Sequence, residues 1–196
     1  YSNRCLDVGL ELAQKFGSTI VASHVYAAKM HDVRFRQMES GLPEEYQEED
    51  ELEKQRNIHD QLITKGMEVI TDSYLDVAKD RTKKLNIPFE GKSLEGRNYT
   101  ELVRDIKESK YDLVIMGALG LGAIKDSLIG TVAERVVRRV QTDTLLIKYI
   151  PEIHGESSSS DKIVVAVDGS QQSFGGLKTG MELSKALNKP LEIIST

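Results

Sequence analysis

The sequence predicts an α/β protein built around a parallel sheet. Three apolar runs have the length of single strands, and they lie at Thr19–Tyr26, Asp112–Gly117 and Thr144–Lys148. They do not alternate strictly between polar and apolar residues, which is typical of strands that are buried on both faces. Segments with helical periodicity separate the runs, so we expect a parallel sheet with helices on both faces.

The first half of the chain is predicted to be largely helical. Apolar residues recur at three- and four-residue steps over residues 6–16, so we expect a helix there that ends at Gly17. Residues from about 29 to 63 form an acidic insertion that we expect to turn helical near Pro43. Helical periodicity continues beyond it, as one long helix or as two with a break near Gly66.

Shorter elements follow. We expect a short, irregular strand at residues 87–94 and an amphipathic helix at 98–109, capped by Asn98 or Thr100. A further helix is predicted at about 132–140. Together with the three apolar runs, these segments complete one α/β domain over residues 1–150.

After this domain the chain begins to repeat. Residues 151–160 have the Gly- and Ser-rich composition of a linker. Gly180–Leu183 aligns with Gly9–Leu12, and on this alignment the counterpart of the apolar run Ile163–Val167 would lie before Tyr1. We therefore expect the first domain to lack its opening strand in this chain, and residues 161–196 to begin a second, similar domain.

A second interpretation of residues 161–196 is strand donation. Ile163–Val167 is the only segment of this chain that matches the character of the missing strand. It could enter the first domain of its own or a neighbouring chain, and Asp168 would then reach the loop described next.

Composition excludes several classes of partner. The formal net charge is −5, which argues against a sequence-independent grip on nucleic acid. The single cysteine, Cys5, allows no intrachain disulfide, so we expect a reducing compartment and a cytoplasmic protein. No apolar run approaches the about 18 residues of a membrane helix, so no membrane is expected as a partner.

A glycine-rich loop carries the functional signal. After the strand at 112–117 the chain has the pattern G-x2-G-x9-G-[ST], formed by Gly117, Gly120, Gly130 and Thr131. The missing side chains let the backbone approach a ligand and present N–H groups to an anion. A helix that begins at Gly130 and Thr131 adds a second anion site.

An explanation without a ligand also fits this loop. Thr131 and Glu134 form the capping-box pattern T-x-x-E, which needs no bound anion. The common phosphate motif G-x4-G-K-[ST] is absent from the sequence. The joint spacing of the glycines nevertheless favours nucleotide binding.

At this point the chain resembles the universal stress protein family, as a tandem member, over nearly its whole length. The glycine loop, the helix that follows it and the strand at Asp143–Lys148 match the last loop, helix and strand of that family, and Asp168-Gly169-Ser170 matches its opening signature. The resemblance implies a Rossmann-like, three-layer sandwich with a parallel five-stranded sheet, of the adenine nucleotide alpha hydrolase type. It also implies ATP, with or without Mg²⁺, bound by Val25, Met116, Gly117, Gly120, Gly130, Thr131, Val132 and Asp168.

The loop departs from the family pattern in one respect. Ala118 and Leu119 replace the usual polar pair, and Leu121 replaces a residue that is often basic. Side-chain help for phosphate is therefore poor. Binding would rest on backbone N–H groups, with Lys125 as a supplement.

We expect a regulatory ATP-binding protein of the stress response rather than an enzyme. No general base is apparent near the loop, although slow ATP hydrolysis stays open. The alternative is a nucleotide-independent interaction module of the same fold. By the resemblance, the strand at Thr144–Lys148 lies at a sheet edge, so the expected assembly is a homodimer or a tandem-domain pseudo-dimer.

Overall fold

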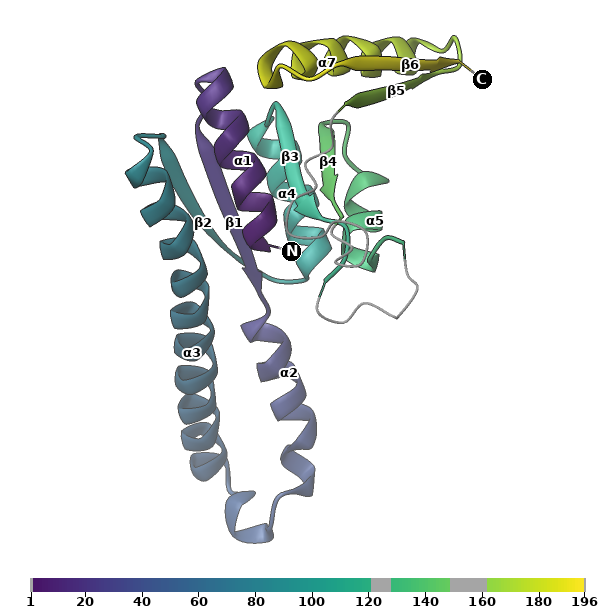
Figure 1. Cartoon of the computed structure of the whole chain (residues 1–196). Helices are drawn as coiled ribbons and strands as arrows, with labels where there is room; N and C mark the ends of the chain where they lie inside the picture. Colours follow the sequence, from purple (N-terminus) through teal and green to yellow (C-terminus); the bar gives the residue numbers. More distant parts are fainter. Residues whose placement is uncertain (1, 121–127, 149–161, 196) are drawn as a thin grey trace.

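The computed structural model describes residues 2–120, 128–148 and 162–195, and it confirms the α/β class (Figure 1). The strands are β1 (Ile20–Tyr26), β2 (Phe89–Glu95), β3 (Leu113–Gly117), β4 (Asp143–Ile147), β5 (Ile163–Val167) and β6 (Leu191–Ser195). The α-helices are α1 (Ser2–Phe16), α2 (Ala28–Met38), α3 (Glu49–Lys84), α4 (Asn98–Ser109), α5 (Thr131–Val137) and α7 (Gln171–Leu187). Two short 3-10 helices, η1 (Glu39–Gly41) and η2 (Glu44–Tyr46), connect α2 to α3.

The strands form three parallel pairs and not the single five-stranded sheet that the family resemblance implied. β1 pairs with β2, β3 with β4, and β5 with β6. Within the described residues, neither β1 nor β3 has a strand on its other side. The expected five-stranded sheet is therefore wrong for the described chain, because no strand there lies between β1 and β3 and pairs with both.

The C-terminal segment forms a local strand–helix–strand unit. β5 runs parallel to β6, with Ile163 opposite Leu191. α7 approaches β5 so closely that a Cβ on Gly180 would lie 2.5 Å from Cγ2 of Val165. Donation of Ile163–Val167 to the first domain of its own chain is therefore wrong, since β5 pairs with β6 and with neither β1 nor β3.

Helix α1 connects the two N-terminal strand pairs. Its buried residues Leu10 and Ala13 form a core cluster with Ile87. On the same helix, a Cβ on Gly9 would lie 3.6 Å from the side chain of Ile115 in β3. α1 therefore packs on both pairs and joins them in the first domain.

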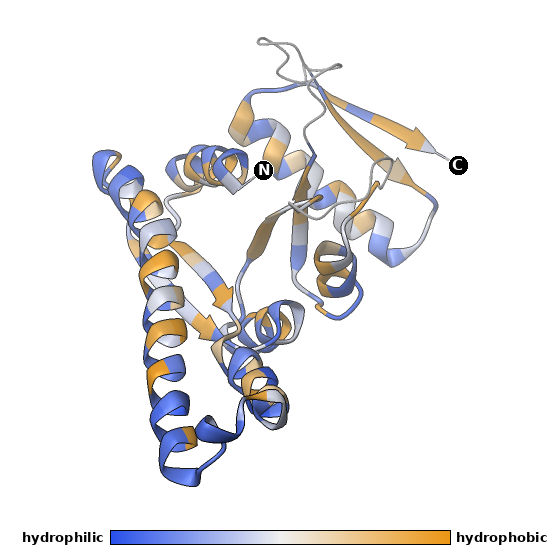
Figure 2. Cartoon of the chain, turned by 90° about the horizontal axis from the view of Figure 1, so that it is seen from below, coloured by the Kyte–Doolittle hydropathy of each residue, from blue (hydrophilic) through white to orange (hydrophobic). Residues whose placement is uncertain are grey.

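The acidic insertion is a long helical hairpin that extends away from the strands (Figure 1). It is already helical from Ala28, so the expectation that helix begins near Pro43 is wrong. α3 runs without a break through Gly66, which confirms the single long helix. At a rise of 1.5 Å per residue, its 36 residues span about 54 Å. Hydrophilic residues dominate the far end of the hairpin (Figure 2).

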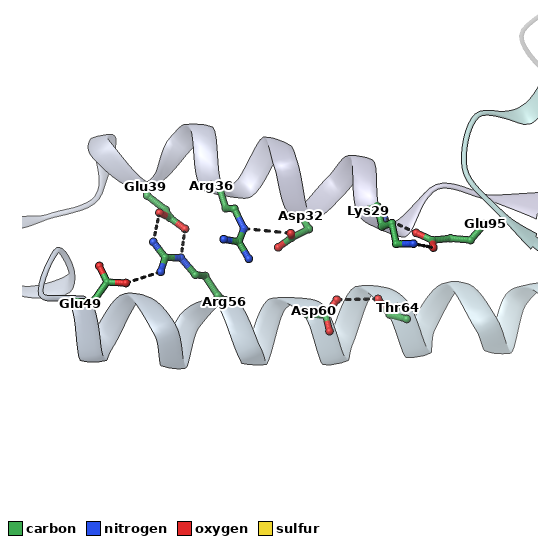
Figure 3. Close-up of polar contacts among 9 residues, drawn as sticks. All are labelled: Lys29, Asp32, Arg36, Glu39, Glu49, Arg56, Asp60, Thr64 and Glu95. Carbon is green, nitrogen blue, oxygen red and sulfur yellow. Dashed lines mark hydrogen bonds and ion pairs between the residues drawn. The ribbon is translucent and has the colours of Figure 1, made fainter. Parts of the chain in front are cut away.

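The far end and the base of the hairpin each have an ion pair that fixes its position (Figure 3). Arg56 of α3 donates two hydrogen bonds to the carboxylate of Glu39, each of 2.7 Å, and a third of 2.8 Å to Glu49. At the base of the hairpin, Nζ of Lys29 lies 2.8 Å from the carboxylate of Glu95, the last residue of β2. No helix in the described part of the chain is long and apolar enough to cross a membrane.

Candidate functional site

The predicted nucleotide site lies where parallel strands end. β1, β2 and β3 end at Tyr26, Glu95 and Gly117, and in a parallel arrangement such ends share one edge. Val25 is the last but one residue of β1, and Met116 and Gly117 are the last two residues of β3. The structure therefore places these three predicted residues at the carboxyl ends of their strands.

The glycine loop closes on itself through its backbone. The N–H of Gly130 donates a 2.6 Å hydrogen bond to the carbonyl of Ala118. A Cβ on Gly130 would lie 3.3 Å from that carbonyl oxygen, whereas a Cβ on Gly120 would meet none of the described residues within 4 Å. A side chain at position 130 would thus press on the closed loop, whereas the described residues leave open space at Gly120. Residues 121–127, which include Lys125, lie outside the described residues.

The capping-box explanation of this loop is wrong. The N-cap of α5 is Gly130, in an extended conformation, so Thr131 is already the first helical residue and cannot cap. Glu134 pairs with Arg138 at 3.0 Å. No side chain caps this N-terminus. The T-x-x-E pattern therefore does not account for the presence of Thr131.

A cavity of about 240 Å³ lies beside the start of α5. Thr131 and Val132 line it, together with residues that the sequence did not single out as a site. These come from the start of α2 (Met30), the start of α4 (Arg97, Asn98, Tyr99) and the middle of α5 (Arg135). Of the eight predicted site residues, only Thr131 and Val132 line this cavity.

Tyr99 organises the basic side of the cavity. The guanidinium of Arg135 lies 4.6 Å from the centre of the Tyr99 ring, and that of Arg139 lies 5.7 Å from it. A hydrogen bond with Thr100 and the positive charge of Arg135 lower the pKa of Tyr99. These are cation–π contacts, and they fix Arg135 on one wall.

The same wall includes the N-terminus of α4. Its N-cap is Arg97, not Asn98 or Thr100 as the sequence predicted, and no side chain caps the helix. Arg97 adopts an extended conformation, which lets the helix begin one residue earlier than the expected caps allow. The first residues of this 12-residue helix line the cavity, so the positive end of the helix lies there beside Arg97.

Asp168 does not join the other predicted residues. Its carboxylate accepts a 3.0 Å hydrogen bond from the N–H of Ser170, which in turn caps α7, and hydrogen bonds with Ser170 lower the pKa of Asp168 to about 2. α7 reaches the first domain at Asp143, where Thr179 donates a 3.1 Å hydrogen bond. Asp143 is the first residue of β4, so this contact is at the amino edge, opposite the glycine loop.

The cavity residues that the sequence did not single out carry one usable signal. Arg97, Asn98 and Tyr99 directly follow β2 and Gly96, so they leave the same carboxyl edge as the glycine loop. Arg135 lies on α5, four residues after Thr131, and is exposed. Only the packing of α4 against α5 brings it to Tyr99.

Comparisons with known proteins support a common family. The model of the universal stress protein family matches residues 1–148. Universal stress protein MJ0531 of Methanocaldococcus jannaschii is 27% identical over 88 residues, which are 45% of this chain and 52% of that protein. The match therefore spans about half the length of that relative.

Solved structures share the fold. The structure of the hypothetical protein MJ0577 matches with a TM-score of 0.52 and 18% identity, over 74% of this chain and 88% of that one. A universal stress protein solved in complex with cAMP matches with a TM-score of 0.45 and 21% identity, over 74% and 84% of the two chains. At this identity the first likeness establishes the α/β fold and nothing beyond it.

Proposed function

Because the chain belongs to the universal stress protein family, we propose that it binds an adenine nucleotide, ATP, at the carboxyl edge of β1 and β3 and acts as a regulatory protein in the stress response. The observation that carries this proposal is the closed glycine loop. Gly130 seals the loop against Ala118, while Gly120 leaves open space in front of it. A backbone that is closed on one side and open on the other can receive phosphate oxygens.

Seven of the eight predicted residues have a role in this proposal. Gly117, Gly120 and Gly130 let the phosphates approach the backbone, and Thr131 and Val132 bring the N–H groups of the first turn of α5. Met116 lies beside the ribose. Val25 meets the adenine ring through its backbone groups at the end of β1. Asp168 keeps no role in this chain, because its carboxylate caps the loop before α7.

The proposed role is binding rather than catalysis. Among the described residues that line the cavity there is no Asp, Glu or His that could orient a water molecule for hydrolysis. The described residues hold no group of three or more metal-ligating side chains, so Mg²⁺ that arrives with ATP would be held chiefly by the phosphates. Release of phosphate from ATP, measured over hours, tests this part of the proposal directly.

The first experiment asks what the protein carries. The purified protein is denatured, the released small molecules are identified by mass spectrometry, and ATP binding is measured by titration calorimetry. Gly120→Val should weaken ATP binding by about tenfold or more, because the new side chain fills the open space before the loop. Gly66→Val is the matched control, since it also fills open space but lies on α3, far from the loop in sequence.

Gly130 is the poorer target for this test. A side chain there would press on the carbonyl of Ala118 at 3.3 Å, so the loop would shift even without a ligand. Equal ATP affinity for wild type and Gly120→Val would contradict the proposed site. No released nucleotide and no ATP binding would favour the alternative, a nucleotide-independent interaction module.

We further propose that the protein assembles as a homodimer or as a tandem-domain pseudo-dimer.

A further inference from the structure

We propose that Arg97 and Arg135 bind the outer phosphates of the nucleotide and so make the site selective for a triphosphate over a monophosphate. The inference rests on the proposed nucleotide site, which it deepens. The 240 Å³ cavity shares Thr131 and Val132 with that site and continues from them to the two arginines. A phosphate chain that starts on the glycine loop therefore has a path to both guanidinium groups.

The charges around the cavity favour an anionic ligand. Within the described residues, neither Arg97 nor Arg135 forms an ion pair with a carboxylate. The carboxylates nearest to them in sequence already have other partners, because Glu95 pairs with Lys29, Glu101 with Arg104 and Glu134 with Arg138. In a chain of net charge −5, these two arginines thus keep their charge available at the cavity.

The arginines are also oriented for this task. The Tyr99 ring fixes Arg135 against the wall of the cavity, at 4.6 Å from the ring centre. Arg97 is the N-cap of α4, so its charge lies beside the positive end of a 12-residue helix. A planar guanidinium can donate two parallel hydrogen bonds to one phosphate, which a lysine cannot do.

The pair compensates for what the glycine loop lacks. Ala118 and Leu119 offer no polar side chain, and Ala118 is only 2% exposed, so the loop contributes backbone groups alone at these positions. Backbone N–H groups bind one phosphate without distinguishing AMP from ATP. The two arginines, which lie further along the cavity, would act only on the additional phosphates, and this difference produces the selectivity.

The experiment compares ATP, ADP, AMP and inorganic tripolyphosphate by titration calorimetry at two salt concentrations. For the wild type we expect ATP to bind about tenfold or more tightly than AMP, with the stronger salt dependence for ATP. In the double variant Arg97→Gln/Arg135→Gln, ATP should weaken to near the affinity of AMP, while AMP should change by less than about twofold. Arg138→Gln is the matched control, because Arg138 lies on the same helix, is exposed and pairs with Glu134.

Variants of Tyr99 separate the effect of the orientation of Arg135 from the effect of its charge. Tyr99→Leu keeps both arginines but removes the ring under Arg135, so it should lower the preference for ATP over AMP, whereas Tyr99→Phe should retain it. Far-UV circular dichroism confirms that each variant is folded. A structural role for the stack alone would change thermal stability and leave the ATP-to-AMP ratio unaltered.

The outcomes separate this inference from the proposed function. If the wild type binds ATP and AMP equally, or if the double variant keeps the wild-type ratio, the inference is wrong while adenine nucleotide binding stands. If no adenine nucleotide binds but tripolyphosphate binds and is lost in the double variant, the phosphate role stands and the proposed nucleotide is wrong. If neither probe binds, both are wrong.

Discussion

Asp105 and His24 are both withdrawn from solvent and both have a lowered pKa, but at neutral pH Asp105 is charged and His24 is neutral. Asp105 is 8% exposed, yet Lys92 and Tyr111 each donate to it a hydrogen bond of 2.8 Å. Burial alone would raise the pKa of Asp105, but these hydrogen bonds outweigh it and the pKa lies below its usual value. Its stabilising contribution is therefore present at neutral pH and is lost only as the pH falls through that lowered pKa.

His24 contacts a hydroxyl group and an aromatic ring rather than a charged side chain. Its Nδ1 lies 2.9 Å from Oγ1 of the fully buried Thr71, and its ring lies 5.1 Å from the centre of the Tyr74 ring. Burial lowers the pKa of His24. The folded state thus holds a neutral imidazole, while the unfolded chain takes up a proton near the ordinary pKa of about 6.5.

The sign of the resulting pH dependence follows from linkage. Below about pH 6.5 the unfolded state binds more protons at His24, so the free energy of unfolding should fall as the pH falls, until the lowered folded pKa is reached. Urea unfolding between pH 7.5 and about 5 measures this change. The variant His24→Gln should show a shallower decrease over the same range. A proton titration of His24 by NMR with a pKa above about 6.5 would contradict the argument.

At the scale of elements, the α2–α3 hairpin depends on a few polar contacts more than on a core. Its apolar residues Leu62, Val69 and Ile70 are 69%, 68% and 53% exposed. Arg56 of α3 pairs across the hairpin with Glu39 and within its own arm with Glu49. The rings of Phe35 and His59 stack across the hairpin with their centres 4.3 Å apart. The hydrogen bonds that Arg56 donates to Glu39 and Glu49 raise the pKa of Arg56, which stays charged at any accessible pH.

We predict that Arg56→Met loosens the hairpin without unfolding the strands. Without the guanidinium, two carboxylates at the far end lose their shared partner, so α2 and the first turns of α3 should open more often. Hydrogen exchange followed by mass spectrometry should show amide exchange there faster by about tenfold, with the amides of β1 and β2 unchanged. Arg36→Met is the control, because its exposed pair with Asp32 should contribute little. Uniform acceleration through β1 and β2 would contradict a local role.

Whether the sequence predicts a feature depends on how far apart in the chain the interacting residues lie. The helix at 98–109 and the strand at 163–167 follow from local periodicity, and both are confirmed. The caps were wrong, because Gly130 and Thr131 are both acceptable N-caps by type and only the backbone conformation decides between them. The pairing of Arg135 with Tyr99 joins residues far apart in the chain, so only tertiary packing reveals it.

At the scale of the whole molecule, the feature with the largest consequence for assembly is the unpaired edge that each described strand exposes. Each of the three sheets has two strands, so in the described residues every strand exposes one edge with unpaired N–H and C=O groups. Such edges pair readily with a strand from another chain. α1 contacts both β1 and β3, so a helix rather than strand pairing joins the β1–β2 pair to the β3–β4 pair. The molecule is therefore suited to association through a strand edge.

The outer edge of β4 can be tested residue by residue. The carbonyl of Ile147 accepts a 2.9 Å hydrogen bond from the N–H of Ala118, so the peptide groups of Ile147 face the side of β3. Because strand residues alternate, the groups of Leu145 also face β3, whereas those of Thr144 and Leu146 face the outer edge. Proline at an outward position removes only an N–H that a partner strand would use.

We predict that the wild-type chain forms a dimer through this edge and that Thr144→Pro abolishes it. Sedimentation velocity over a range of concentrations should show a monomer–dimer equilibrium for the wild type and a monomer for Thr144→Pro, with the same far-UV circular dichroism. Leu145→Pro is the internal comparison, because it removes an N–H that faces β3 and leaves a ladder carbonyl without its donor, which should lower the stability of the monomer by about 1–3 kcal/mol. A wild type that stays monomeric at every concentration, or a Thr144→Pro variant that dimerises equally well, would show that the edge of β4 is not the contact. Since Thr144 and Leu145 are adjacent, the same substitution at the two positions separates an effect on association from an effect on folding.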